Sequence, residues 1–326
     1  MTALFIWFLC YNFPMYDAII IGAGPAGLAA AVYFARQKMK FLILTGHVGG
    51  QTIWSSDIED YLGFHLLNGQ DLVKQFTAHL ADYAGTYDMH EGEHVTSIVK
   101  TPSSQEGAGG VLFTVVTEKA SYESKSVLIV TGTKRRELGV PGEKEFYGKG
   151  VTYCATCDAP LFKGKKVFVI GGGNSAMDAA IFAEKYATDV SIITINPELK
   201  GDPVMLSKIV ANPRIHVLAL TKTTKIIGNS FVSGIGYSGA DGIEHEEPCE
   251  GVFIEIGLMP STSFADIVEK DQWKQIVIDK RNRTSVPGIF AAGDCTDVAD
   301  KQIGIAVGEG SKAALELIKY LQTSHV

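Results

Sequence analysis

Two cysteines separated by two residues, Cys154 and Cys157, are the side chains of this 326-residue sequence that most directly suggest chemistry. A Cys-x-x-Cys arrangement brings two sulfurs within disulfide reach, and a thiol in such a motif ionises more readily than an isolated one. Asp158 follows immediately and could deliver a proton to a departing thiolate. The motif therefore predicts dithiol–disulfide exchange.

Other interpretations of this motif are open. A closed structural zinc site needs four ligands, but the remaining cysteines are scattered and no histidine pair stands at ligand spacing, which disfavours zinc. A pair of cysteines can also be buried and inert, because free cysteine often behaves as a small apolar residue. Asp158, for its part, could simply cap a helix.

Two glycine-rich turns are the next chemical signal. The first, Gly22-Ala-Gly24-Pro-Ala-Gly27, lies between an apolar run at 18–21 and an Ala-rich helix predicted to reach Gln37, with a strand at 40–46. In such a βαβ unit the glycines allow a tight turn and a close approach of pyrophosphate to a helix N-terminus. The second turn, with Gly171, Gly173 and Ala176, has the same context. Two dinucleotide sites indicate electron transfer between two carriers, although a glycine turn can also serve packing alone.

The segment "FAAGDC" favours a flavin as one carrier. Asp294 would stand at a strand end and could accept a hydrogen bond from a ribityl hydroxyl. A helix predicted at 303–321 would aim its positive N-terminus at the flavin ring. Alternatively, Asp294 is a turn or helix-cap residue.

These motifs require an α/β fold with two Rossmann-like (three-layer ββα/βα) dinucleotide-binding domains, the second inserted into the first. We expect one dinucleotide-binding domain split into 15–132 and 258–326, and a second at 133–257 that carries the Cys-x-x-Cys; the resemblance described below makes the first an FAD-binding domain and the second an NAD(P)-binding domain. Three strand-like segments at 94–99, 111–118 and 126–132 indicate an antiparallel meander. The segments 130–138 and 257–263 would connect the domains.

Composition restricts the partners and the compartment. The net charge of −7 disfavours nucleic acid, since phosphate binding needs clustered Lys and Arg. Five cysteines with one close pair indicate a cytoplasmic chain and no disulfide framework. The apolar residues 1–14 are too few to span a bilayer, so we expect no membrane association and interpret them as an extension before Met15.

With both glycine turns, "YCATCDAP" and "FAAGDC" in this order, the chain from Met15 onward resembles the low-molecular-weight thioredoxin reductases. It is also similar to the flavoprotein subunit of alkyl hydroperoxide reductase, without that subunit's N-terminal domains. The resemblance implies FAD in the split domain, a nicotinamide cofactor in the inserted domain, and a homodimer. It implies that Cys157 faces the flavin, that Cys154 attacks the partner's disulfide, and that Asp158 is the acid/base.

The same resemblance assigns the cofactor contacts. For FAD these are Gly22, Gly24, Ala26, Gly27, Thr45, Gly50, Gln51, Val95, Thr131, Gly132, Gly293, Asp294, Gln302 and Ile303. For NAD(P) they are Gly171, Gly173, Asn174, Ser175 and Ala176. Because the cysteine pair and the nicotinamide must both reach one flavin, the inserted domain is expected to rotate between two arrangements.

One departure from the family pattern concerns the nicotinamide cofactor. NADPH-specific relatives carry several arginines after the second strand of this unit, whereas the segment 194–202 here reads "TINPELKGD". No arginine occurs between Arg136 and Arg214, and Lys200 is the nearby cation. A 2′-phosphate prefers bidentate, charged partners. We therefore expect NADH rather than NADPH, with Glu198 a candidate for the ribose and another electron donor still possible. Asp60, where relatives often have Asn, is left out of the site.

The predicted function is a flavin-dependent thioredoxin-disulfide reductase. Electrons would pass from a nicotinamide cofactor through FAD and the Cys154–Cys157 disulfide to a thioredoxin or glutaredoxin-like protein. One alternative is a flavoprotein on the same scaffold with another donor or acceptor, such as a peroxiredoxin-system reductase, a reductase that does not use NADPH, or a ferredoxin–NADP or NADH-oxidase type. A further alternative is a non-catalytic redox-sensing or metal-binding module that merely holds nucleotide.

Overall fold

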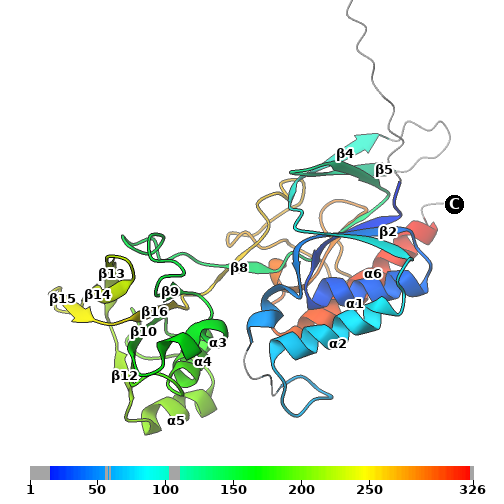
Figure 1. The fold of residues 1–326 in the computed structure, drawn as a ribbon. Helices are drawn as coiled ribbons and strands as arrows, with labels where there is room; N and C mark the ends of the chain where they lie inside the picture. Colours follow the sequence, from blue (N-terminus) through cyan, green and yellow to red (C-terminus); the bar gives the residue numbers. More distant parts are fainter. Residues whose placement is uncertain (1–14, 56–57, 59, 103–110, 324–326) are drawn as a thin grey trace, which may run out of the picture.

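The structure, a computed structural model, describes residues 15–55, 58, 60–102 and 111–323 and has two lobes (Figure 1). The N-terminal and C-terminal parts of the chain share one lobe, and the middle of the chain forms the other. The predicted extension 1–14 lies outside the described residues, as do the side chains of Thr156 and Cys157. Within the described ranges, no helix combines the length and the hydrophobicity that crossing a membrane requires.

The first lobe is built on a parallel sheet with strand order β18-β7-β1-β2-β3. The strands are β1 (Ala18–Ala23), β2 (Phe41–Val48), β3 (Tyr87–Glu91), β7 (Val127–Ile129) and β18 (Ile289–Ala291). One face packs on α1 (Pro25–Arg36), α2 (Gly69–Ala81) and α6 (Ile303–Thr323). The other face packs on an antiparallel sheet of β4 (Val95–Pro102), β5 (Val111–Thr117) and β6 (Ser121–Ser124). This is the three-layer ββα architecture.

Alternation along the strands explains the layers. Ile20 and Ile43 face the helices, whereas their neighbours Ile19 and Leu42 face the antiparallel sheet, and all four side chains are fully buried. Strands covered on both faces are apolar at every position, as the run "AIII" of β1 is.

The inserted lobe repeats this plan. Its parallel sheet has the order β12-β11-β10-β16-β9. The strands are β9 (Val151–Thr152), β10 (Lys166–Ile170), β11 (Asp189–Ile193), β12 (Ile215–Leu218) and β16 (Gly251–Ile254). Helices α4 (Asn174–Ala183) and α5 (Pro203–Ala211) cover one face. The antiparallel strands β13 (Lys222–Gly228), β14 (Val232–Ser238) and β15 (Glu244–Pro248) cover the other. The predicted fold class is thereby confirmed.

Two short strands connect the lobes. β8 (Thr133–Arg135) leads into the inserted lobe, and β17 (Leu258–Pro260) leads out of it. They pair antiparallel, with Thr133 opposite Pro260 and Arg135 opposite Leu258. The chain therefore enters and leaves the inserted lobe side by side, and β8 lies between the two lobes in Figure 1.

Four short helical segments complete the description. They are η1 (Gly50–Trp54), α3 (Ala155–Asp158), η2 (Ala159–Phe162) and η3 (Gly293–Cys295). Three of them, η1, α3 and η3, lie at the ends of the parallel strands or between the lobes and contribute to the site described below.

The predicted meander was wrong in its third strand. Strand β7, from the segment 126–132, pairs parallel with β1 and β18 in the central sheet, and β6 takes the third place in the meander. The run "VLI" of β7 is buried at every position, which suits a central parallel strand. Strand β3, whose sequence is "YDMHE", was not predicted, because it carries little apolar signal.

Candidate active site

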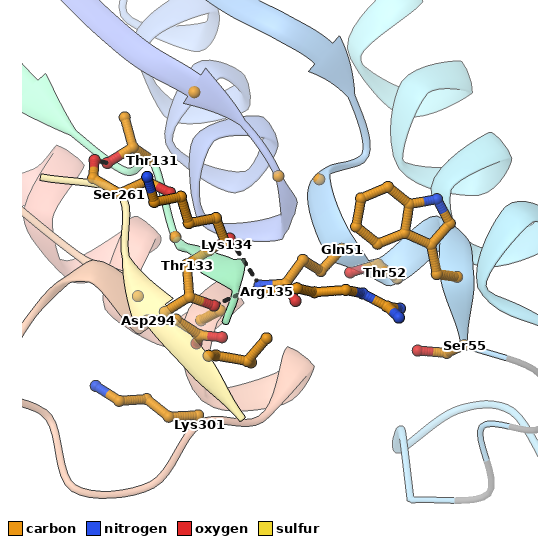
Figure 2. A pocket seen from close by; sticks show the side chains of 18 of the residues that line it. Gln51, Thr52, Ser55, Thr131, Thr133, Lys134, Arg135, Ser261, Asp294 and Lys301 are labelled. Carbon is orange, nitrogen blue, oxygen red and sulfur yellow. Dashed lines mark hydrogen bonds between the residues drawn. The ribbon is translucent and has the colours of Figure 1, made fainter. Parts of the chain in front are cut away.

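A cavity of about 1360 Å³ opens between the two lobes. The first lobe contributes the C-terminal end of β1, η1 and the N-terminus of α6, and the inserted lobe contributes α3 and the N-terminus of α4. Side chains predicted for three different roles, the flavin, the nicotinamide and the dithiol, thus face one space. Figure 2 shows part of the first-lobe side of this pocket, with Gln51, Thr133 and Asp294 around it.

The first glycine turn has the geometry of a phosphate cradle. Gly22 has φ +112°, and a Cβ there would collide with the Val130 carbonyl. Gly24 is the N-cap of α1 and has only the Cα of Gly50, 3.9 Å away, near the position of a Cβ. Gly27 packs against Gly22, so it lies behind the cavity wall. The open space at Gly24 and the free N–H groups of α1 suit a pyrophosphate.

Residues from six further segments complete the first-lobe wall. Thr45 accepts the Ala23 N–H and donates to the His47 carbonyl at 2.8 Å, fixing the end of β2. Gln51 Nε2 donates to the Thr133 carbonyl at 3.0 Å and also bonds the Thr133 hydroxyl (Figure 2). The predicted residues on this wall are Gly22, Gly24, Ala26, Thr45, Gly50, Gln51, Val95, Thr131, Gly132, Gly293, Asp294, Gln302 and Ile303.

The charged residues Asp294 and Lys301 both line the cavity (Figure 2). Burial raises the pKa of the Asp294 carboxyl, and the nearby Lys301 opposes that rise. Burial also lowers the pKa of the Lys301 ammonium, whose Nζ donates to the Thr296 carbonyl at 2.6 Å. A ligand hydroxyl that donates a hydrogen bond to the buried Asp294 carboxylate would replace part of its lost solvation. Lys301 was not among the predicted residues.

The second glycine turn lies on the opposite side of the cavity. Gly171 has φ +146°, and a Cβ there would collide with the Glu255 carbonyl and lie 2.9 Å from the Ala176 Cβ. Gly173 is the N-cap of α4. Asn174 and Ser175 reach the cavity, whereas Gly171, Gly173 and Ala176 shape the turn behind it.

The end of β11 has few groups that could bind the 2′-phosphate of NADPH. Ile195, two residues past the strand, is 71% exposed, and the preceding Thr194 hydroxyl accepts the Asn196 N–H. Lys200 is exposed, and its backbone N–H donates to the Gly172 carbonyl at 2.8 Å. The acids Asp178, Asp202 and Glu255 line the same side of the cavity.

Cys154 lies at the cavity wall and is disulfide-bonded. Its N–H donates to the Thr152 hydroxyl at 3.0 Å, and that hydroxyl donates to the Asp158 carboxylate. The Asp158 N–H closes the turn by donating to the Cys154 carbonyl at 3.1 Å. Thr152, which the sequence did not single out, thus couples the position of Asp158 to that of Cys154.

A buried carboxylate anchors the strand before the cysteine. Glu143 is 1% exposed and accepts the Leu138 N–H at 2.7 Å, the Gly139 N–H at 2.6 Å and the Tyr153 hydroxyl at 2.6 Å. Burial, together with this bond to Glu143, raises the pKa of the Tyr153 phenol, so the hydroxyl stays protonated and donates. The residue next to Cys154 is therefore held rigidly.

Arg135 and Glu255 form an ion pair where the two lobes meet. Neither residue belongs to a motif found in the sequence. Arg135 Nη1 lies 3.1 Å from Glu255 Oε1, and the guanidinium lies 5.1 Å from the centre of the Trp54 ring. Burial raises the pKa of Glu255 to about 7; Arg135 opposes this rise and Asp178 adds to it. Arg135, Glu255 and Trp54 all line the cavity.

Two further thiols are chemically quiet. Cys249 is free and buried, and burial raises its pKa to about 12. Cys295 is free and fully buried beside Asp294, where burial also raises its pKa. Neither lines the cavity within the described part of the chain. No cluster of three or more potential metal ligands occurs among the described side chains.

Comparison with known proteins decides the family. The model of the pyridine nucleotide-disulphide oxidoreductases matches residues 16–310. The chain belongs to this family. It is 38% identical over 309 residues to an alkyl hydroperoxide reductase subunit of Escherichia coli, and this match covers 94% of the chain and 58% of that protein. The chain thus spans somewhat more than half the length of the curated relatives it matches.

Solved structures of thioredoxin reductases are similar over both lobes. The enzyme of Lactococcus lactis in the FR conformation has a TM-score of 0.86 and 32% identity, covering 94% of this chain and 99% of that one. The enzyme of T. acidophilum has a TM-score of 0.84 and 41% identity, covering 95% and 99%. The resemblance drawn from the motifs is confirmed, and the chain is an FAD-dependent oxidoreductase of this family.

Membership implies FAD and a pyridine nucleotide, and the first lobe fits FAD on its own geometry. The open cradle at Gly24, the α1 N-terminus and the buried Asp294 carboxylate match a pyrophosphate and a ribityl chain. The second turn fits a dinucleotide less fully, because Asp178, Asp202 and Glu255 line its side of the cavity, and the exposed Lys200 that follows the turn is not part of that lining.

Proposed function

We propose that this protein is a thioredoxin-disulfide reductase that takes electrons from a nicotinamide cofactor and passes them, through FAD and a Cys154–Cys157 disulfide, to a thioredoxin or glutaredoxin-like protein. The observation that carries the proposal is the shared cavity, which brings Cys154, the first glycine turn and the helix start that follows the second glycine turn to one space. Bound FAD would accept a hydride and supply two electrons to the disulfide.

The chain's own residues would divide the remaining work. The split first lobe (15–132 and 258–326) holds FAD, and the inserted lobe (133–257) holds the nicotinamide cofactor and the cysteines. Cys157 receives the electrons, and Cys154 leaves as a thiolate. Asp158, held by the Thr152 hydroxyl, supplies its proton. Cys154 then attacks the partner's disulfide, and Cys157 resolves the mixed disulfide, which leaves the partner as a dithiol.

We further propose that the inserted lobe rotates about β8 and β17 between a nicotinamide-facing and a disulfide-facing arrangement. Two antiparallel strands of three residues each form the connection, and a short connection of this kind can absorb a hinge motion. We propose a homodimer in the cytoplasm, on the strength of the resemblance alone.

NADH is proposed as the preferred nicotinamide cofactor. Apolar Ile195 and the acids Asp178 and Asp202 oppose a 2′-phosphate, which would meet no arginine in this segment. The same observation favours a second candidate, a reductase on this scaffold that takes electrons from another donor.

An anaerobic titration of the purified protein separates these candidates. Addition of NADH should bleach the flavin absorbance at a lower concentration than NADPH does. If neither nucleotide bleaches the flavin while a chemical reductant does, the nicotinamide assignment fails and the second candidate stands.

The disulfide step has its own test. Cys154→Ser should bleach normally with the donor but lose nearly all reduction of a thioredoxin-like protein, because the attacking sulfur is gone. Cys249→Ser is the matched control and should retain full turnover, because that thiol is buried away from the cavity. A Cys154→Ser variant with full turnover would contradict the proposal.

A further inference from the structure

Arg135 touches both lobes at once. It ends β8, and its guanidinium reaches across the pocket toward the η1 segment, where Figure 2 shows it beside Gln51 and Thr52. There it lies over the Trp54 ring at 5.1 Å, while its Nη1 contacts Glu255 Oε1 at 3.1 Å. The Arg135 side chain is 21% exposed and the Glu255 side chain 13%, so the pair is largely shielded from water.

The two partners of Arg135 belong to different lobes. Glu255 follows β16, and its N–H donates to the Ile170 carbonyl at 2.7 Å, which fixes it to the sheet of the inserted lobe. Trp54 ends η1 in the first lobe, with its ring 5.6 Å from the His47 ring. A rotation about the β8–β17 pair would carry Glu255 away from Trp54, so one arginine could no longer satisfy both.

Two neighbouring contacts do not bridge the lobes in this way. The Gln51–Thr133 bonds join η1 to the first residue of β8, on the first-lobe side of the connection. Arg136, the next residue, is exposed, and its backbone N–H bonds the Gly257 carbonyl within the hinge.

We propose that Arg135 is a positioning residue that holds the inserted lobe against the first lobe in the arrangement seen here, by pairing with Glu255 and stacking on Trp54 together. This inference rests on the proposed function in one respect, namely that the lobe must move during turnover. Release of either contact would then favour departure of the lobe from this arrangement.

The charge on Glu255 sets the strength of this contact. The charged groups that face its carboxyl are Arg135 from β8 and Asp178 from α4. Arg135 attracts the ionised form, whereas Asp178 and burial oppose it. Arg135 is therefore the charge that compensates an ionised Glu255 at this shielded junction.

Small-angle X-ray scattering of the flavin-loaded protein reports how the two lobes are arranged in solution. We compare wild type with variants of two neighbouring arginines, Arg135 and Arg136. Wild type should scatter as the present arrangement. Arg135→Gln should shift the equilibrium between arrangements about tenfold, because it loses a shielded ion pair and a cation–π contact. Arg136→Gln, which removes the same charge one residue away, should scatter as wild type. Identical curves for the two variants, or a wild-type curve unlike the present arrangement, would overturn the inference.

A second measurement reports the Trp54 contact directly. In a background in which Trp7 and Trp273 are changed to Phe, Trp54 is the remaining tryptophan. Arg135→Gln should raise the access of iodide to Trp54, and Arg135→Lys should give an intermediate value because the planar stack is lost while the charge stays. An access that is the same in all variants would also overturn the inference.

These readouts need no turnover, so they separate the two claims. A protein whose flavin is not reduced by NADH or NADPH, but whose lobes respond to Arg135→Gln, would refute the proposed function and leave the positioning role. A competent reductase whose lobes ignore Arg135 would do the reverse.

Discussion

Glu143 takes no part in the chemistry proposed for Cys154, yet it helps to fix the position of that cysteine. It accepts three hydrogen bonds within the fold, and one of them comes from Tyr153, the neighbour of Cys154. A buried acceptor that gathers two backbone N–H groups and a phenol fixes the entry to the redox-active turn.

Replacing this carboxylate should lower stability. Glu143→Ala leaves three donors without a partner and should lower the free energy of unfolding by about 2–4 kcal/mol. Glu137→Ala is the matched control, because Glu137 pairs with Lys144 on the surface and should change stability by less than about 1 kcal/mol. Denaturant unfolding of the two variants checks this, and equal effects would contradict the role given to Glu143.

Glu255 should give the protein a specific dependence on pH. Its pKa is about 7 in the fold against an ordinary 4.5, so the folded state favours the neutral acid. The associated stability is fully present below about pH 4.5, declines as the pH rises, and is lost above about pH 7. The stability of wild type relative to Glu255→Gln should therefore fall across this window. A flat difference in unfolding free energy would contradict the assignment.

Residues whose chemistry is written in local spacing were predictable from the sequence. The glycines of both turns, Cys154 and Asp158 each belong to a short motif, and each lies where a strand end must place it. Trp54, Arg135 and Glu255 could not be found in this way, because they are far apart in the chain and meet only after the hinge strands pair.

At the scale of elements, the contact between α1 and α6 controls the first glycine turn. Gly310 of α6 lies so close to α1 that a Cβ there would collide with the Ala26 carbonyl. Ala26 is part of this turn and lines the cavity. The absence of a side chain at Gly310 therefore lets two helix backbones approach beside the phosphate cradle.

Two glycines of α6 test this contact. Gly310→Ala should push the helices apart, lower the unfolding free energy by about 1–3 kcal/mol and weaken retention of FAD. Gly308→Ala is the control two residues away, with no atom within 4 Å of its Cβ position, and should stabilise the helix by up to about 1 kcal/mol. Thermal unfolding and the flavin content of the purified variants give the answer. A Gly310→Ala variant that keeps FAD and full stability would show that the helices tolerate a methyl group there.

Elements with a strong apolar period were predictable, and the partners of strands were less so. The closing helix and the two βαβ units appear where the sequence placed them. Strand β7 was assigned to the wrong sheet, because an apolar run of three does not reveal whether its neighbours are parallel or antiparallel. Strand β3 lies at the edge of its sheet, where mixed polarity hides it.

At the scale of the whole molecule, the two lobes have separate cores. Two buried clusters use residues of the first lobe, two use residues of the inserted lobe, and none of these four draws on both. Together with the paired hinge strands, this supports the proposed boundaries of the inserted lobe.

The inserted lobe should therefore be removable. Replacing residues 136–257 by Asn-Gly would join Arg135 to its partner Leu258 through a two-residue hairpin turn. The shortened protein should fold, stay yellow with bound FAD and no longer be bleached by nicotinamide cofactors. Visible absorbance and circular dichroism check this. A shortened chain that is insoluble or colourless would contradict the division, and a longer deletion of 133–260, which removes Thr133, should fail for loss of the Gln51 contact.

The burial of Cys249 and Cys295 makes it easier to measure how far the Cys154–Cys157 disulfide has been reduced. Mild alkylating reagents act on ionised, accessible sulfur, and neither condition holds at these two positions. Among the cysteines between Met15 and Thr323, Cys154 and Cys157 should therefore take up the alkylating label. The amount of label bound by the native protein after addition of the electron donor would measure how much of this disulfide has been reduced. Once Cys10, which lies outside the described residues, is replaced by Ser, this stoichiometry could be read without subtracting label at other cysteines.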